Sequence, residues 1–422
     1  MFKFLHAADL HLDSPLRGLA AYEGAPVNAL RGATRRAFDQ LIQLAIDEQV
    51  AFVLLAGDIY DGDWKDYNTG LYFHKQMVKL REHNVTVYLI AGNHDAESQI
   101  TRTLRLPDNV RVLATKRPET IRDEDLGVAV HGQGFATRAV TEDLAANYPV
   151  PQGGMLNIGL LHTMLTGREG HQPYAPTTLN ALVDRRYDYW ALGHVHQRVV
   201  LNEAPWVVYP GNLQGRHARE TGAKGATLVT VDGGRIESVE HRDLDVLRWE
   251  VCRVAAAGAA RGSDVIDRVS VAVAALAADR DGRSLALRVE INGPCRAHED
   301  LVARPDDWVQ QVRAAALDAG AGAVWVEKVR LATSIDLRLE DLLLREDAIG
   351  GLVRAIDAML ADPARVKECG LLFTDLQSKL PPDLRGGDDP LDLRDVDVLR
   401  DGLVDVKQLL VTRLMGDHGG AA

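Results

Sequence analysis

Cysteine and aromatic residues are scarce in this chain of 422 residues, where aromatic side chains make up 5%. The three cysteines, Cys252, Cys295 and Cys369, lie far apart, so they offer neither a disulfide framework nor a cysteine zinc site and suit a reducing cytoplasm. No apolar run approaches the length that crosses a bilayer, so we expect no membrane segment. The first residues lead directly into Asp9 and are therefore expected to form a strand rather than a signal peptide.

Positive charge is also in deficit. The chain has 48 Lys and Arg residues against 60 Asp and Glu residues, and its formal net charge is -12. The excess acid is concentrated in residues 336–422, which hold 11 basic and 18 acidic residues. This balance weakens a prediction of nucleic-acid binding without excluding it, because phosphate binding requires local rather than overall positive charge.

Alternating apolar runs predict a strand-helix-strand-helix-strand unit at the start of the chain. The expected strands cover residues 3–8, 51–56 and 85–91, and the helices between them cover residues 28–48 and 67–82. The strand at residues 51–56 is wholly apolar, which predicts burial on both faces. Such a unit forms a sheet whose ligands bind at the carboxyl ends of its strands.

Short strands dominate from residue 110 onward. They are expected at residues 110–113, 128–131, 157–162, 187–192, 206–209, 226–231 and 235–241, with one helix at residues 177–185. A second sheet that faces the first would explain this change. We therefore predict an α/β protein with a two-sheet sandwich over residues 1–243.

Two further regions follow the sandwich. Residues 244–335 are predicted to form a small α/β capping domain, with strands at 251–254, 284–291 and 323–331 and helices at 263–278 and 299–319. Residues 336–422 are predicted to form a helical C-terminal tail, with a Pro- and Gly-rich linker at 379–390. Its amphipathic helix at 396–414 either packs on the body of the protein or docks a partner.

Polar side chains follow five of the predicted strands, each directly after an apolar run. These side chains are Asp9, His11, Asp58, Asn93, His162, His194 and His196. Each motif alone has an ordinary structural explanation, such as a turn or a buried histidine, but all five in this order are hard to reach by chance. Carboxylate, amide and imidazole groups without cysteine suit hard or borderline divalent metals, and the set is large enough for two ions.

Asp58 is the candidate bridge between two metals, because Gly57 allows close approach of the backbone and a carboxylate can give one oxygen to each ion. One metal would be completed by Asp9, His11 and His196, and the other by Asn93, His162 and His194. A water molecule between the ions would become a hydroxide nucleophile near neutral pH and attack phosphorus.

His94 is not needed as a ligand. We predict that it acts as the general acid or stabilises the leaving oxygen. Asp95 is predicted to hold its ring and to raise its pKa. Phosphodiester hydrolysis fits this set, because an alkoxide leaving group requires an acid.

These motifs resemble those of the calcineurin-like metallophosphoesterases. The matching residues are Asp9-Leu10-His11, Gly57-Asp58, Gly92-Asn93-His94-Asp95, His162 and Gly193-His194-Val195-His196. Three longer segments resemble the bacterial DNA repair exonuclease branch, the SbcD-like and especially the YhaO-like proteins. They are residues 7–13, 57–61 and 209–217. Residues 63–66, Asp-Trp-Lys-Asp, depart from the Pro-Ser pair usual in SbcD-like proteins, which bears on the preference for DNA ends.

The resemblance implies Mn²⁺-dependent nuclease activity on DNA, with two bound ions and a role in repair. It also implies an SMC-like coiled-coil ATPase as partner, with the tail helices at the base of its coiled coil, and a homodimer, because relatives often dimerise. Arg216 and His217 either contact a phosphate near the site or belong to a structural loop.

Two alternatives remain open. The same site could hydrolyse a small or other phosphoester, as a phosphatase or cyclic-nucleotide phosphodiesterase does. Protein phosphatases of this fold usually carry Glu after the Asn-His pair, whereas this chain has Asp95. The chain could also be a scaffold that positions an ATPase on DNA.

Overall fold

The computed structural model describes residues 1–14, 32–61, 67–96, 105–165, 175–335, 342–380 and 391–416, with side chains up to residue 410. Residues 381–390 of the linker expected at 379–390 and the departure at 63–66 lie outside the described residues. The chain divides into two compact units. The first comprises Met1–Val251, Ala275–Arg288 and Gly320–Lys328, and the second Cys252–Ala274, Val289–Ala319 and Val329–Ala422.

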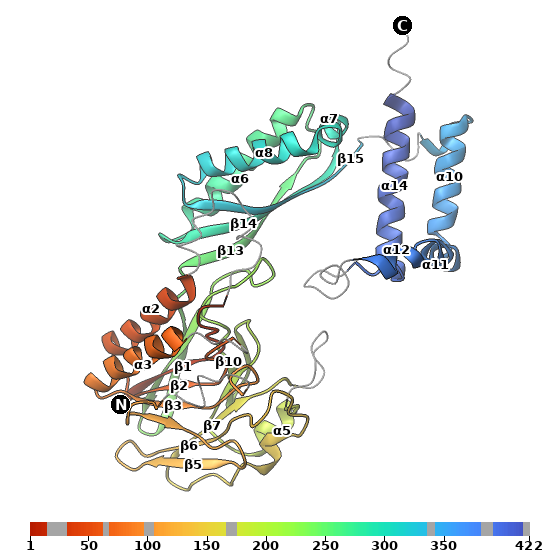
Figure 1. Cartoon of the computed structure of the whole chain (residues 1–422). Coiled ribbons are helices and arrows are strands. Elements are labelled where there is room, and N and C mark those ends of the chain that lie inside the picture. Colours follow the sequence, from red (N-terminus) through yellow and green to blue (C-terminus); the bar gives the residue numbers. More distant parts are fainter. Residues whose placement is uncertain are drawn as a thin grey trace. The chain divides into compact units, whose positions relative to one another are not determined.

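Two sheets of six strands each form the body of the first unit (Figure 1). The first sheet has the order β12-β11-β1-β2-β3-β4, made of β12 (Arg235–Asp243), β11 (Gly225–Asp232), β1 (Phe2–Ala7), β2 (Phe52–Leu55), β3 (Thr86–Leu89) and β4 (Val110–Val112). Strands β1 to β4 run parallel, whereas β11 is antiparallel to both of its neighbours. The parallel strands therefore end at one edge.

The second sheet faces the first. Its order is β5-β6-β7-β8-β10-β9, made of β5 (Glu119–Asp123), β6 (Val128–Gln133), β7 (Leu156–His162), β8 (Tyr189–Gly193), β10 (Trp206–Tyr209) and β9 (Val199–Glu203). The central strands β6, β7, β8 and β10 are parallel, and the two edge strands are antiparallel. The predicted α/β sandwich is confirmed.

The distribution of strands between the sheets differs from the expectation. Strands β4, β11 and β12 were expected in the second sheet but extend the first one, because β4 pairs with β3 and β11 pairs with β1. The sequence did not predict β5 or β9, which lie at the edges of the second sheet and are only partly buried. Strand periodicity shows which face of a strand is buried but not which neighbour it pairs with.

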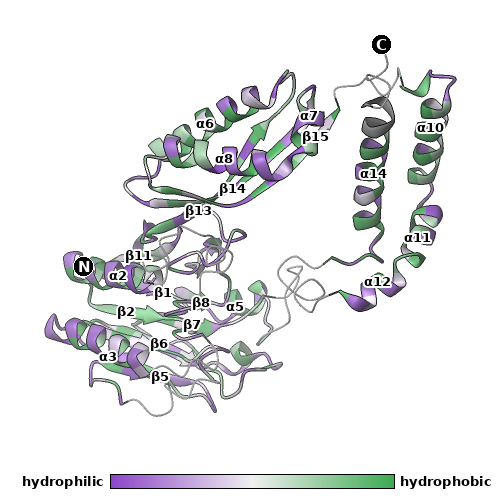
Figure 2. Cartoon of the chain, turned by 45° about the horizontal axis from the view of Figure 1, so that its top comes forward, coloured by the Kyte–Doolittle hydropathy of each residue, from purple (hydrophilic) through white to green (hydrophobic). Residues whose placement is uncertain are grey.

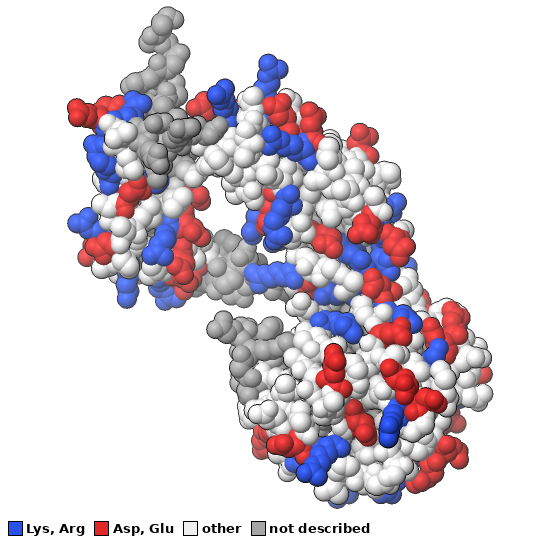
Figure 3. Space-filling model, turned by 180° about the vertical axis from the view of Figure 1, so that it is seen from behind, with Lys and Arg blue, Asp and Glu red and all other residues white. Residues whose placement is uncertain are grey.

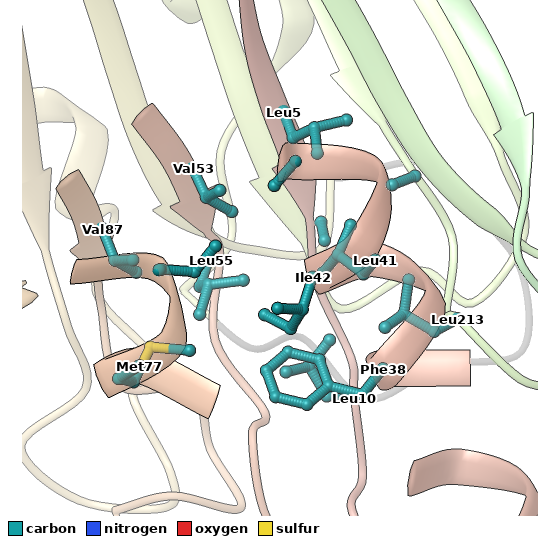
Figure 4. Packing of buried hydrophobic residues seen from close by; sticks show 14 of the residues in the cluster. Leu5, Leu10, Phe38, Leu41, Ile42, Val53, Leu55, Met77, Val87 and Leu213 are labelled. Carbon is teal, nitrogen blue, oxygen red and sulfur yellow. The ribbon is translucent and has the colours of Figure 1, made fainter. Parts of the chain in front are cut away.

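Helices α2 (Ala33–Asp47) and α3 (Tyr67–Glu82) cover the outer face of the first sheet. Phe38 and Leu41 of α2 and Met77 of α3 belong to one buried cluster with Val53 and Leu55 of β2 (Figure 4). The alternate residues of β2, Phe52 and Leu54, belong instead to the cluster between the two sheets. Strand β2 is therefore buried on both faces, as its apolar sequence predicts.

Aromatic rings fill the space between the sheets. The Phe4 ring stacks on Phe52 with centroids 4.9 Å apart and meets Tyr189 of the second sheet edge-on at 5.5 Å. On the outer face of the second sheet, α5 (Leu179–Asp184) covers Trp190, whose indole N–H donates to the Leu182 carbonyl at 3.0 Å. These contacts hold both sheets in a fixed alignment.

The predicted capping domain contains a three-stranded sheet, β13 (Leu247–Ala255), β14 (Ser284–Cys295) and β15 (Val324–Ile335). Its helices are α6 (Gly262–Ala278), α7 (His298–Ala303) and α8 (Pro305–Ala319). We expected one helix over residues 299–319. The break falls at Pro305, which begins α8 because proline lacks the N–H that a continuous helix requires.

The tail forms its own helical cluster, α10 (Ala348–Leu360), α11 (Pro363–Leu371), α12 (Thr374–Lys379) and α14 (Val396–Gly416). Helices α10 and α14 lie side by side (Figure 2), and Lys407 pairs with Asp357 at 2.6 Å. Val353 and Val366 are buried in this cluster. The terminal helix thus packs on the other helices of the tail.

No helix in the described part of the chain has the length and apolarity to cross a membrane.

His6 connects the two sheets. Its ring is fully buried, with Nδ1 3.0 Å from the Tyr189 hydroxyl and Nε2 3.1 Å from the Leu192 carbonyl. The carbonyl can only accept, so Nε2 carries the proton and Nδ1 accepts from the hydroxyl. Burial lowers the pKa of His6 from 6.5 to about 3, so the ring stays neutral in the folded protein.

This arrangement predicts a pH-dependent contribution to stability. Below pH 6.5 the unfolded chain takes up a proton at His6 that the folded chain refuses, so stability falls from that pH toward pH 3. We expect the pH slope of the unfolding free energy to decrease in His6→Gln by up to about 1.4 kcal/mol per pH unit between about pH 4 and 6. Urea unfolding across this range measures it, and an unchanged slope would contradict the buried neutral ring.

Candidate metal centre

The site begins where β1 and β2 end side by side. Backbone N–H groups of Asp9 and His11 donate to the carbonyls of Gly57 and Asp58, each at 3.0 Å. Asp9, His11 and Asp58 have positive φ angles of 52°, 42° and 54°. Such left-handed backbone is unfavourable for residues with side chains and is concentrated at functional sites. Here the left-handed residues follow the ends of the buried strands β1 and β2, so the chain turns sharply where each strand ends.

Close backbone approach requires glycine at two positions. A Cβ on Gly57 would lie 2.7 Å from Nδ1 of His162, and a Cβ on Gly92 would lie 2.2 Å from Oδ1 of Asp58. Gly57 also has a φ of 91°. The sequence prediction that Gly57 allows close approach is therefore confirmed by the geometry, and the space it opens is occupied by His162.

One group of side chains consists of Asp9, His11 and His196, whose ligand atoms all lie within 4.8 Å of one another. Nε2 of His11 is 3.2 Å from Nε2 of His196, which is 4.0 Å from Oδ1 of Asp9. The backbone N–H of His194 donates to Oδ2 of Asp9 at 3.0 Å. This bond ties the loop after β8 in the second sheet to the end of β1 in the first.

A second group surrounds His162. Its Nε2 lies 2.9 Å from Oδ1 of Asn93, 3.3 Å from Nδ1 of His194 and 3.5 Å from Oδ2 of Asp58. Oδ2 of Asp58 is also 3.9 Å from Nε2 of His11. Asp58 thus lies between the two groups, where a carboxylate that bridges two cations would lie.

The donor atoms fit divalent cations. Nδ1 of His162 donates to the Ala56 carbonyl at 2.9 Å, so the neutral ring presents the lone pair of Nε2 to the oxygens of Asn93 and Asp58. Electron pairs that face one another in a buried space repel unless a cation lies among them. Oxygen and imidazole nitrogen suit Mn²⁺ and similar ions.

Burial disfavours charge on these groups when no cation is bound. It raises the pKa of Asp58 and of Asp9, and it lowers the pKa of His11 and takes that of His162 to about 3. Neutral imidazole is the form that binds metals, so the histidines are ready as ligands at neutral pH. A bound cation would favour the ionised carboxylates.

The structure corrects the role predicted for Asp95. Its Oδ1 accepts from the backbone N–H groups of Ile59 and Tyr60, and its Oδ2 accepts from that of Gly92, at 2.9 to 3.0 Å. Asp95 therefore joins the loops after β2 and β3 rather than holding the His94 ring. Adjacency in sequence was misleading, because the turn directs the two side chains to different partners.

Asp61 takes the position expected for Asp95. Its Oδ1 is 3.4 Å from Nδ1 of His94 and 3.4 Å from Nδ1 of His11, and its Oδ2 accepts from the Ser14 hydroxyl at 2.8 Å. Burial opposes its ionisation, but hydrogen bonding and charge at His11, with Arg216 and Ser14, hold the pKa of Asp61 well below its usual range. Its place three residues after Asp58 is the sequence signal that could have identified it.

Arg216 lies beside His196, and His217 lies beside Glu220, which contacts the same ring. Nη1 of Arg216 is 3.6 Å from Oδ1 of Asp61, and Nη2 is 3.4 Å from Nδ1 of His196. His217 lies 3.5 Å from Oε1 of Glu220, a residue that the sequence analysis did not single out. The structure thus brings all eleven predicted site residues to this edge, although Asp95 acts through the backbone.

Two donor groups that share a carboxylate, beside a histidine paired with an acid, are the arrangement that the sequence predicted for a metallophosphoesterase. The comparison with protein families agrees: the family model of calcineurin-like phosphoesterases matches residues 2–198, and that of the middle domain of metallophosphoesterase YhaO matches residues 249–334. The chain carries a calcineurin-like metallophosphoesterase domain.

Among similar proteins, the uncharacterized metallophosphoesterase YhaO of Bacillus subtilis is 40% identical over 60% of this chain and 62% of its own length. The D component of the nuclease SbcCD from Escherichia coli is 25% identical over 58% of this chain and 68% of its own length. The DNA double-strand break repair protein Mre11 of Sulfolobus acidocaldarius is 24% identical over 58% of this chain and 64% of its length. The match to YhaO therefore covers less than two thirds of that relative.

The shared position of Asp58 predicts the effect of its replacement. We expect the metal-free protein to bind two equivalents of Mn²⁺, and Asp58→Asn to weaken both by at least about tenfold, because the amide has only one acceptor oxygen and no charge. Titration calorimetry measures stoichiometry and affinity. Asp39→Asn, which alters a carboxylate on α2 bonded to Tyr72 and Gln76, is the matched control. Normal binding by Asp58→Asn would exclude a bridging role.

Proposed function

We propose that this chain is a metal-dependent DNA nuclease that hydrolyses phosphodiesters, acting on DNA ends in repair with Mn²⁺. The observation that carries the proposal is the position of Asp58 between two donor groups, with the His94 ring at their border. Two divalent cations bound there would neutralise phosphate oxygens and lower the pKa of a water molecule. The ligands would be the seven residues predicted from sequence.

His94 is placed to serve the leaving oxygen. Its backbone N–H donates to Oδ1 of Asp58 at 2.9 Å, which fixes the main chain beside the donor groups. Asp61 can hold the proton on Nδ1 of the ring, since its low pKa keeps it ionised. Nε2 of His94 is then the atom that can exchange a proton with the leaving group.

Arg216 is the proposed phosphate contact, together with His217. The guanidinium lies within 3.4 to 3.6 Å of His196 and Asp61, at the edge of the donor groups. Planar guanidinium groups match phosphate oxygens in pairs. Among the described residues on the face drawn in Figure 3, basic and acidic side chains are interspersed, so the proposal rests on the site and not on a basic surface.

The names of the relatives support DNA as substrate. SbcCD is a nuclease and Mre11 is a DNA double-strand break repair protein, and both match over more than half of this chain. Their identities of 24% and 25% leave the substrate of this chain to be tested. Hydrolysis of a small phosphoester and a scaffold role are the alternatives.

The substrate experiment compares linear duplex DNA, single-stranded DNA and bis(p-nitrophenyl) phosphate in the presence of Mn²⁺. We expect the wild type to degrade DNA, and His94→Ala to lower kcat by about 10² to 10⁴ with two equivalents of Mn²⁺ still bound, because only proton transfer is lost. His83→Ala, which removes an exposed histidine at the end of α3, should behave as wild type.

The outcomes separate the three functions. Hydrolysis of the small ester without cleavage of DNA would favour a phosphodiesterase with another substrate. A wild type that binds Mn²⁺ but turns over none of the substrates would favour the scaffold.

We also propose that the tail docks an SMC-like coiled-coil ATPase. Leu371 at the end of α11, Leu372 directly after it and Leu376 in α12 are apolar but 72%, 81% and 50% exposed. Adjacent exposed apolar groups on a surface favour association with a partner helix. The SbcCD relative is named as one subunit of a nuclease, which supports a partner for this chain.

Charge substitutions in this segment test the docking proposal. We expect Leu372→Asp with Leu376→Asp to abolish co-purification of the ATPase and to leave Mn²⁺ binding unchanged, because these side chains contribute surface rather than core. Leu344→Asp alters a leucine that is 79% exposed before α10 and is the matched control. Retention of the ATPase by the double variant would refute docking at this segment.

A further inference from the structure

Glu220 lies behind His196, on the side away from the other donor atoms. Its side chain is only 8% exposed, and Oε1 is 2.6 Å from Nδ1 of His196. Oε2 accepts from the backbone N–H of Arg216 at 2.7 Å and from Nδ2 of Asn212 at 2.9 Å. Both oxygens therefore have fixed donors, and the carboxylate cannot rotate without losing one of these bonds.

The backbone of His196 is held by the same segment of chain. Nζ of Lys224 donates to the His196 carbonyl at 2.9 Å, and the backbone N–H of Asn212 donates to it at 3.3 Å. A Cβ on Gly211 would lie 3.0 Å from this carbonyl oxygen, and Gly211 has a φ of 81°. The segment after β10 thus packs directly against the His-Val-His loop and supports both its main chain and its ring.

We propose that Glu220 is a positioning residue for His196: it keeps the proton on Nδ1 and so aims the lone pair of Nε2 at Asp9 and His11. The neutral imidazole ring carries one proton and can present only its other nitrogen to a cation. Without an acceptor behind it, the ring can protonate Nε2 or rotate about its side-chain bonds, and either change removes a ligand. The inference rests on the metal centre of the proposed function and is independent of DNA as substrate.

The charge around Glu220 suits this role. A buried carboxylate is tolerated when cations and hydrogen-bond donors surround it. Nη2 of Arg216 is 3.7 Å and Nε2 of His217 is 3.5 Å from Oε1. Arg216 also reaches Asp61, the acid beside His11 and His94. One arginine thus lies beside both of the carboxylates, Asp61 and Glu220, that contact ring nitrogens of the site.

Glu220→Gln tests the acceptor function without changing the shape of the side chain. Two N–H donors hold Oε2 and one ring nitrogen holds Oε1, so we expect the amide oxygen to stay with Asn212 and Arg216 and the NH₂ group to face Nδ1 of His196. Glu220→Ala removes both oxygens. Glu48→Gln is the matched control, because it breaks an equally short pair with Lys3 in the same unit, away from the donor groups.

The readout is calorimetric titration of the metal-free full-length protein with Mn²⁺ alone. We expect both Glu220 variants to weaken one of the two Mn²⁺ equivalents by about 10- to 100-fold, as loss of a partner behind a ligand does, with the other equivalent changed less than about threefold. The thermal midpoint of each metal-free variant shows whether it is folded. In ¹⁵N-histidine spectra of metal-free Glu220→Gln, the Nδ1–H signal of His196, assigned with His196→Gln, should be lost.

Two results would overturn the inference: wild-type affinity for both equivalents in a folded Glu220→Gln, or equal weakening of both equivalents. The second result would indicate general loosening of the fold, as would a large fall in the thermal midpoint of both Glu220 variants. A wild type that binds two Mn²⁺ but leaves DNA intact would refute the nuclease proposal alone, because the test of Glu220 reads metal affinity.

Discussion

Several side-chain nitrogens and oxygens of the metal centre lie close together in a buried space, and the rest of this structure depends on that constraint. His11 and His196 approach nitrogen to nitrogen at 3.2 Å, and His162 faces an amide oxygen and a carboxylate. A proton can join only two of these atoms at a time, whereas a divalent cation can be shared by several imidazole nitrogens and carboxylate or amide oxygens. The left-handed backbone at Asp9 and Asp58 follows from the same requirement, since extended strands would carry these side chains past one another.

Two sheets are needed to meet this constraint. The first supplies the acids, His11 and the amide from loops after β1, β2 and β3, and the second supplies His162 at the end of β7 and the His-Val-His pair after β8. Neither sheet has a complete set of ligands. The aromatic packing of Phe4 on Tyr189 and the hydrogen bonds of His6 align the sheets, so core packing far from solvent determines distances in the site.

A ring of carboxylates around the donor groups orients them. Asp61 contacts two histidines, Glu220 contacts a third, and Asp95 joins the loops after β2 and β3 through backbone N–H groups. Arg216 lies between Asp61 and Glu220 and compensates their charge. Histidine has two usable nitrogens, so a site built from histidines depends on the partners that select one of them.

The sequence by itself predicted most strands and helices of residues 1–243, although not β5 or β9, and it supplied the seven proposed ligands, because apolar periodicity and the motifs after strands are local features. Only the tertiary structure decided that β4 and β11 belong to the first sheet, and that Asp61 rather than Asp95 contacts the His94 ring. The sequence analysis also did not identify Glu220 as a residue of the site. The partner of a strand edge or of a carboxylate depends on how distant segments meet, which no local pattern contains.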